Sequence, residues 1–241
     1  MRLLACLLLC FPLVSLAAGG GAHLDRANIV PDDRQSLQRG ARLFANYCLS
    51  CHSASYMRYN RLSESLGLTE AQIVENLMPA GGKIGSVMKV AMSAEDAREW
   101  FGTVPPDLSV ISRSRGVDWL YTYLRSFYVD ESRAMGVNNV VFPDVGMPNV
   151  LWDLQGTQKA IYAKHDGDHG VVLEGLEITE PGQLTPREFD RAIRDLVNFL
   201  AFMGEPAKQE RISLGIKVLL FLFFFLLVAY FLKKEYWKDV H

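Results

Sequence analysis

The sequence has no excess of charge of either sign, no internal repeat and no low-complexity segment. Its 25 Lys and Arg residues are balanced by 27 Asp and Glu residues, whereas a nucleic-acid-binding domain carries a clear basic excess. With 49% of its residues hydrophobic, the chain can bury enough apolar surface to fold. It also carries no phosphate-binding glycine loop, nucleophile triad or metal-ligand cluster. These absences argue against disorder, a nucleic-acid partner and catalysis by this chain alone.

Cysteine is scarce, and the positions of the cysteines exclude a disulfide framework. Four are present, but Cys6 and Cys10 lie in an apolar N-terminal stretch. Only Cys48 and Cys51 remain, and they are too near each other in the sequence to close a stabilising disulfide loop.

Residues 1–17 have the form of a secretory signal peptide. Arg2 precedes an apolar stretch that runs to Leu16, and small residues follow from Ala17. Because this stretch is short for a stable membrane span, we expect cleavage after residue 17. An uncleaved N-terminal anchor is the alternative.

Residues 212–232 form a second apolar stretch, interrupted by the single charge of Lys217. A helix rises about 1.5 Å per residue, so this stretch spans roughly 31 Å and can cross a bilayer core. Lysines follow it, and the positive-inside rule therefore places residues 233–241 in the cytoplasm. Residues 18–211 are then expected to form one periplasmic domain, anchored in the inner membrane by a single span.

Cys48, Cys51 and His52 form the pattern Cys-x-x-Cys-His, which is typical of covalent c-type haem attachment. In a helical segment the two thiols share a face and reach the two vinyl groups of one porphyrin, while His52 faces the iron. A thioredoxin-like redox pair would need a strand-turn-helix context, and a zinc site would need a second pair of ligands. The pattern predicts one covalently bound haem c.

Helical periodicity and capping signals predict a mostly α-helical domain with long loops, and the haem-attachment motif makes the expected fold cytochrome c-like. An amphipathic helix is expected over residues 33–47, and Gly40 within it predicts close packing against another helix. The expected partner is a helix over residues 185–204, which starts with a capping box and a proline. Only residues 139–142 and 171–178 have strand character. Shorter helices are expected to begin at Thr69, Ser93 and Asp118, the last with aromatic residues that are core or haem-pocket wall.

Several later segments carry a family resemblance. Residues 104–109 read Val-Pro-Pro-Asp-Leu-Ser, Arg113 and Arg115 follow, and residues 142–148 read Phe-Pro-Asp-Val-Gly-Met-Pro. Together with the Cys-x-x-Cys-His motif and the segment from residue 198 into the apolar stretch, these motifs resemble bacterial cytochrome c1 in their order. Cytochrome c1 is the membrane-anchored haem subunit of the cytochrome bc1 complex, a ubiquinol-cytochrome c reductase.

The resemblance implies roles for individual residues. Met147 matches the axial methionine of the family, and the prolines and glycine around it favour a bent loop. Arg115 matches an arginine expected to pair with a haem propionate, and Pro106 is expected to pack on the His52 side of the haem. The other candidates for the sixth iron ligand are Met135, Met203, His165 and His169.

The resemblance also implies a function in the respiratory chain. The chain is expected to accept single electrons from the Rieske iron-sulfur protein and to pass them to a soluble or membrane-bound cytochrome c. Cytochrome b and the Rieske protein would be its partners in a dimeric complex. Release of this chain from a longer fusion with cytochrome b is the alternative to a separate precursor with its own signal peptide. The alternatives are a membrane-tethered cytochrome c that donates to a terminal oxidase, and a haem-based sensor, which would need an open iron position.

An acidic segment follows the methionine loop. Between residues 166 and 180 the chain has acidic residues but no Lys or Arg. We expect this segment to steer a basic cytochrome toward the haem, with an ordinary solvated face as the alternative. Its acidic residues are Asp166, Asp168, Glu174, Glu177 and Glu180.

Overall fold

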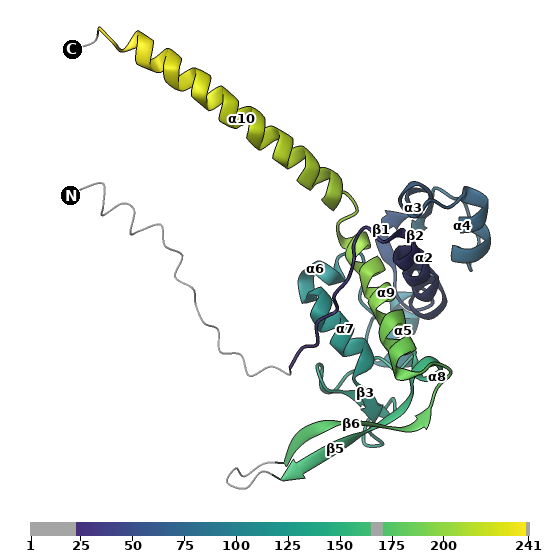
Figure 1. Ribbon diagram of the computed structural model, residues 1–241. Helices are drawn as coiled ribbons and strands as arrows, with labels where there is room; N and C mark the ends of the chain where they lie inside the picture. The colour runs from purple at the N-terminus through teal and green to yellow at the C-terminus, as the bar shows by residue number, and fades with distance from the viewer. Residues whose placement is uncertain (1–22, 165–170, 240–241) are drawn as a thin grey trace.

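The computed structural model describes residues 23–164 and 171–239, so the predicted signal peptide lies outside the described residues. Helices predominate, and the described part of the chain adds three small two-stranded antiparallel sheets. One long helix extends away from the remainder of the molecule (Figure 1). This arrangement confirms the predicted mostly α-helical class.

Long loops join several of the elements, as predicted, and the longest are residues 78–86, 102–110 and 140–151. The helices are α2 (Arg34–Leu43), the π-helix η1 (Phe44–Cys48), α3 (Tyr59–Leu66), α4 (Glu70–Leu77), α5 (Ala94–Phe101), α6 (Ile111–Arg115), α7 (Val117–Arg125), α8 (Trp152–Gln155), α9 (Pro186–Gly204) and α10 (Lys208–Tyr236). The antiparallel strand pairs are β1 (Ala54–Arg58) with β2 (Val87–Met88), β3 (Phe127–Val129) with β4 (Val137–Asn139), and β5 (Gly156–Lys164) with β6 (Val171–Pro181).

Helices α2 and α9 cross at Gly40, as the sequence predicts. A Cβ at this position would overlap the carbonyl oxygen of Asp195 and would lie 2.7 Å from the Cβ of Phe199. Next to the crossing, the Arg39 guanidinium forms an ion pair with the buried Asp195 carboxylate. The absent side chain therefore lets two distant segments approach closely, and both helices contribute buried side chains to the core.

The helix predicted over residues 33–47 is α-helical only in its first part, and its last turn is a π-helix. Helix α2 ends at Leu43 and continues as the π-helix, in which the Leu49 amide donates to the Phe44 carbonyl. Phe44 stays in the core, with its ring centroid 5.6 Å from that of Phe199. A π-turn inserts a residue and shifts the face on which the next residues lie, and such turns often occur at functional sites. The last residue of this one is Cys48, the first cysteine of the motif.

The capping predictions for three helices are confirmed. Thr69 and Thr185 cap α4 and α9 with reciprocal capping boxes, and Ser93 caps α5. Helix α7 begins one residue before the predicted Asp118. The side chain of Asp118 accepts a hydrogen bond from the amide of Ala27 instead of capping its own helix.

The strand predicted over residues 139–142 is wrong, because β4 ends at Asn139. The Asn139 side-chain oxygen accepts hydrogen bonds from the amides of Val141 and Phe142. These amides are therefore satisfied by a side chain, and no partner strand is needed. The strand predicted over residues 171–178 is confirmed within β6, although its partner β5 is not foreseen.

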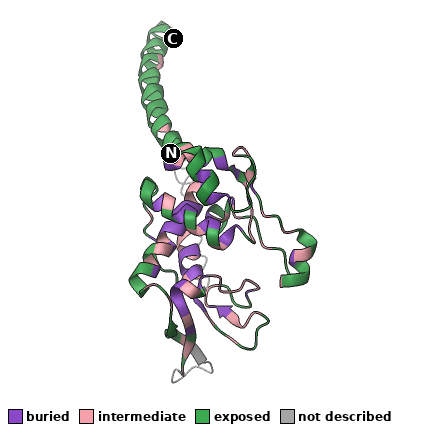
Figure 2. Cartoon of the chain, turned by 90° about the vertical axis from the view of Figure 1, so that its right-hand side faces the viewer, coloured by how far each residue is buried: buried purple, intermediate pink, exposed green. Residues whose placement is uncertain are grey.

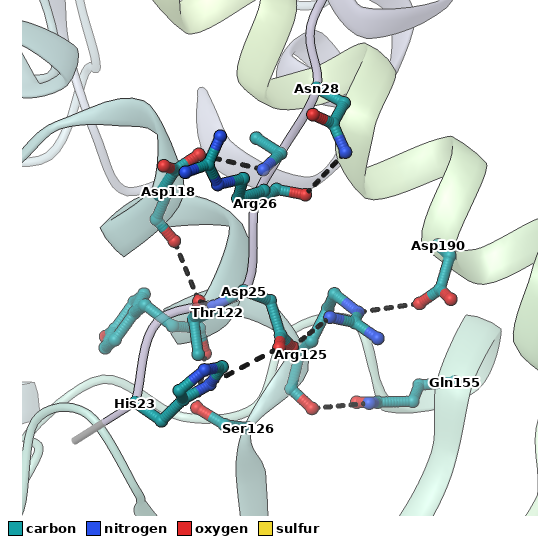
Figure 3. Close-up of polar contacts among 12 residues, drawn as sticks. His23, Asp25, Arg26, Asn28, Asp118, Thr122, Arg125, Ser126, Gln155 and Asp190 are labelled. Carbon is teal, nitrogen blue, oxygen red and sulfur yellow. Dashed lines mark hydrogen bonds and ion pairs between the residues drawn. The ribbon is translucent and has the colours of Figure 1, made fainter.

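An N-terminal strap, residues 23–30, runs along α7 and α9 (Figure 1). Arg125 forms two ion pairs, one with the strap and one with α9. Its Nη1 lies 2.7 Å from Asp25 of the strap, and its Nε lies 2.6 Å from Asp190 of α9 (Figure 3). The Asp25 amide also donates to Thr122 Oγ1 at 2.8 Å. Arg125 thus connects the strap to both helices.

Helix α10 contains the apolar stretch predicted as a membrane span. None of its residues is buried by the protein, and its most apolar window has a mean hydropathy of 2.7 (Figure 2). Such a length of exposed apolar helix matches the thickness of a bilayer core. Helix α10 is therefore a candidate for a single membrane span.

Candidate haem site

The Cys-x-x-Cys-His motif begins at Cys48, the last residue of the π-helix, and forms one further turn. The amides of Cys51 and His52 both donate to the Cys48 carbonyl, at 3.1 and 2.8 Å. The motif therefore has the local helical geometry that the sequence predicts. Both thiols are free, and Cys48 is buried.

The environment of the thiols argues against the redox alternative. Burial, with a smaller contribution from Cys51, raises the pKa of the Cys48 thiol to about 12. A redox-active pair needs a thiol whose pKa is lowered, and this motif precedes β1 instead of joining a strand to a helix. Zinc is also unsupported, because the residues that the structure describes contain no cluster of three metal-binding side chains.

His52 is held by Pro106. The Nδ1 atom of the imidazole lies 2.7 Å from the Pro106 carbonyl oxygen. A carbonyl can only accept a hydrogen bond, so Nδ1 carries the proton and Nε2 keeps a free lone pair. Burial lowers the pKa of His52, although Pro106 and Asp107 oppose this effect. The neutral form, which binds metals, is therefore favoured.

The Pro-Pro-Asp-Leu-Ser segment is fixed around Pro106. The Leu108 amide donates to the Ser53 carbonyl at 2.7 Å. The carboxylate of Asp107 accepts hydrogen bonds from the amides of Ser55 and Ser109. Partial burial opposes ionisation, but these hydrogen bonds lower the pKa of Asp107. The aspartate and serine of the motif thus build the turn that presents the Pro106 carbonyl to His52.

Met147 lies in the loop between β4 and α8 and contacts the aromatic face of α7. The hydroxyl of Tyr123 donates to Met147 Sδ at 3.3 Å, and burial raises the pKa of Tyr123. Its ring stacks on Trp119, with centroids 4.8 Å apart and planes inclined by 10°. The sequence predicts these aromatic residues as core or pocket wall, but it does not indicate their contact with the Met147 sulfur.

Arg115 reaches the same aromatic cluster. Its guanidinium carbon lies 5.1 Å from the Trp119 ring centroid and 5.8 Å from that of Phe142, and it has no carboxylate partner among the residues described. Arg113, by contrast, lies 3.8 Å from the Glu205 carboxylate near the start of α10. Of the two arginines, Arg113 has a carboxylate partner and Arg115 has none in the described chain.

The loop that carries Met147 approaches the segment before Pro106 at Gly146. A Cβ on Gly146 would lie 3.4 Å from the Thr103 side chain, so the Met147 loop adjoins the segment that leads to Pro106. The alternative ligand Met203 is buried in the core on α9. Met135 lines a cavity of about 290 Å³ together with Pro148 and Trp152. His165 and His169 lie outside the described residues.

The acidic segment is described only in part. Asp166 and Asp168 lie outside the described residues, and Glu177 lies 3.0 Å from Lys159 on the neighbouring strand. This ion pair offsets part of the negative charge expected from the sequence.

The available donors fit a covalently bound haem. The motif supplies two free thiols and a neutral imidazole with a free Nε2. Met147 supplies a thioether, and Arg115 supplies a cation without a carboxylate partner in the described chain. His and Met are the axial pair of electron-carrying c-type cytochromes.

Comparisons with known proteins identify the family of this chain. The sequence model described as "Cytochrome C1 family" matches residues 31–81 and 175–240. Cytochrome c1 of Allochromatium vinosum is 52% identical over 99% of this chain and 98% of its own. A protein of Nitrosomonas europaea named "Ammonia monooxygenase gamma subunit" is 48% identical over the full length of both chains. Cytochrome c1 of Rhodospirillum rubrum is 28% identical over 86% of this chain and 83% of its own. The chain therefore belongs to the cytochrome c1 family.

Proposed function

We propose that Cys48 and Cys51 attach one haem c and that His52 and Met147 are the axial ligands of its iron. The observation that carries this proposal is the hydrogen bond between His52 and Pro106, because it leaves Nε2 free for the metal. Arg115 is proposed to pair with a haem propionate, since guanidinium groups match carboxylates in geometry and charge.

The chain is the haem subunit of a bc1 complex, in which cytochrome c1 relays electrons toward cytochrome c. The bound haem supplies a reversible one-electron iron couple. The protein residues hold it: His52 and Met147 would fill both axial positions, which favours electron transfer over ligand binding. Cytochrome b and the Rieske protein are the partners that deliver the electrons, and the chain itself performs no acid-base chemistry.

Topology and assembly are part of the proposal. We assign residues 1–17 as a signal peptide, 18–211 as a periplasmic haem domain, 212–232 as the span and 233–241 as a cytoplasmic tail. The lysines after the span support this orientation. A soluble or membrane-bound cytochrome c would be the acceptor, and the complex would be dimeric.

The second candidate is a carrier that serves another membrane complex. The Nitrosomonas europaea relative, which is 48% identical, bears the name of a monooxygenase subunit. A tethered cytochrome that donates to a terminal oxidase would share the haem motif and α10. Neither of these carriers needs to co-purify with a b-type haem protein.

The test is gentle affinity purification of the full chain from detergent-solubilised membranes, followed by absorbance spectra after addition of a quinol. The bc1 assignment requires a reduced c-type band that is accompanied by b-type haem and blocked by a Rieske-site inhibitor. A c-type band alone, unaffected by the inhibitor, would favour the other carrier. Loss of covalent haem in Cys48→Ala with Cys51→Ala tests the attachment sites.

A further inference from the structure

Tyr123 contacts the loop between β4 and α8 at two points: near the start of the loop and at Met147. Its backbone carbonyl accepts a hydrogen bond from Asn139 Nδ2 at 2.8 Å, where the loop leaves β4. Its hydroxyl donates to Met147 Sδ at 3.3 Å. One residue of α7 therefore connects to both the start of the loop and its proposed iron ligand.

The Tyr123 ring has little freedom to move. It is stacked on Trp119 and meets the Phe127 ring edge-on, with centroids 5.1 Å apart and planes inclined by 67°. Asn139, which holds the backbone of Tyr123, is only 1% exposed. The hydroxyl is therefore carried on a rigid support, and its direction toward sulfur is set by the core.

We infer that Tyr123 is a positioning residue for Met147 and that it tunes the reduction potential of the haem. This inference rests on the proposed role of Met147 as an axial ligand. A thioether sulfur has two lone pairs, and the Tyr123 hydroxyl engages one of them. The other lone pair is then the one directed to the iron, so the hydroxyl also selects the configuration of the bound sulfur.

The electronic consequence has a definite sign. A hydrogen bond withdraws electron density from the thioether and makes it a weaker donor to iron. Ferric iron depends more on this donation than ferrous iron does, so the hydrogen bond favours the reduced state. Tyr123 thereby raises the reduction potential, a property that a merely structural aromatic side chain would not affect.

The variant Tyr123→Phe tests this role, because it removes the hydroxyl and keeps the stacked ring. In the full-length, haem-loaded chain we expect a lower reduction potential than in the wild type. We also expect a shift of the sulfur-to-iron charge-transfer band in the ferric spectrum. Tyr121→Phe is the matched control on the same helix: the Tyr121 ring lies 4.6 Å from the Arg125 guanidinium, and this variant should keep the wild-type potential and band.

Met147→Leu separates this inference from the proposed function. If Met147→Leu loses the charge-transfer band while Tyr123→Phe keeps the wild-type potential and band, the role of Tyr123 is overturned and the ligand assignment stands. If Met147→Leu keeps the band, the ligand assignment fails and the inference fails with it.

A measurement on the unmodified protein covers the case in which the tyrosine variant does not accumulate. Nuclear Overhauser contacts between the Tyr123 ring and the Met147 methyl group are expected in the reduced, diamagnetic protein. Their absence, with the methyl resonance assigned, would overturn the inference.

Discussion

The imidazole Nδ1 of His52 and the carbonyl oxygen of Pro106 lie 2.7 Å apart, although 54 positions separate the two residues in the chain. The contact joins the haem-attachment turn to the Pro-Pro-Asp-Leu-Ser segment. The proline contributes its backbone here, and the neighbouring side chains of the segment fix where that carbonyl lies. Substitution of those side chains should therefore weaken the hydrogen bond of His52 while His52 itself is kept.

Ser109→Ala should loosen this contact. Ser109 is buried, accepts a hydrogen bond from the Tyr56 amide at 3.0 Å and donates to Asp107. Its loss removes two hydrogen bonds, each of which typically contributes about 0.5–1.5 kcal/mol. A weaker His52 hydrogen bond makes the imidazole a poorer donor to iron, so we expect the reduction potential to rise.

Denaturant unfolding and redox titration of the haem-loaded chain test the Ser109 prediction. Ser114→Ala is the control, because the Ser114 hydroxyl only bonds to Ile111 within α6. Wild-type stability and potential in Ser109→Ala would show that the segment does not hold His52.

Gly40→Ala should destabilise the crossing of α2 and α9. The added methyl group overlaps the carbonyl of Asp195 and crowds the Cβ of Phe199. Overpacking of this kind typically costs about 1–3 kcal/mol, measured as a lower denaturant midpoint with an unchanged slope. Gly175→Ala is the control, since a Cβ there meets nothing within 4 Å. Equal midpoints for the two variants would contradict the close approach.

The sequence predicts well what local chemistry determines. The capping boxes of α4 and α9 depend on residues three positions apart, and a glycine within an amphipathic helix marks the crossing at Gly40. Strands are predicted less well. Residues 140–142 have β-forming side chains, but Asn139 satisfies the amides of Val141 and Phe142 and ends β4.

The site is predictable as a set of residues, and its internal contacts are not. The Cys-x-x-Cys-His spacing indicates haem by itself, because its geometry is local. The Pro106 carbonyl has no sequence signal, since every residue carries one, and only the fold brings it to His52. The contact between Tyr123 and Met147 likewise depends on how the β4–α8 loop packs on α7.

Arg125→Ala should release the N-terminal strap. The substitution removes the ion pairs to Asp25 and Asp190 and the contact with the Tyr121 ring. Because these groups are partly exposed, we expect a modest destabilisation of about 1–2 kcal/mol. Amide hydrogen exchange of residues 23–30 should increase.

The control for the strap is Arg113→Ala, which removes a more exposed ion pair to Glu205 near α10. This variant should leave exchange in the strap as it is in the wild type. Unchanged strap exchange in Arg125→Ala would mean that the backbone contacts with Thr122 and Asp118 hold the strap without the arginine.

Asp130 should determine how the β3–β4 hairpin responds to acid. Hydrogen bonds from Ser132 and then Asn138 lower the pKa of Asp130 to about 2, from an ordinary value of 3.8. Since the folded state has the lower pKa, the stabilisation is complete above about pH 4 and is lost as the pH falls toward 2. Asp130→Asn should remove this part of the pH dependence, so its thermal midpoint should fall less between pH 5 and about pH 3 than that of the wild type. Glu131→Gln is the control, because it removes a carboxylate from the same turn and should keep the wild-type response. If the thermal midpoints of wild type and Asp130→Asn fell equally in acid, the hairpin would not depend on the Asp130 carboxylate.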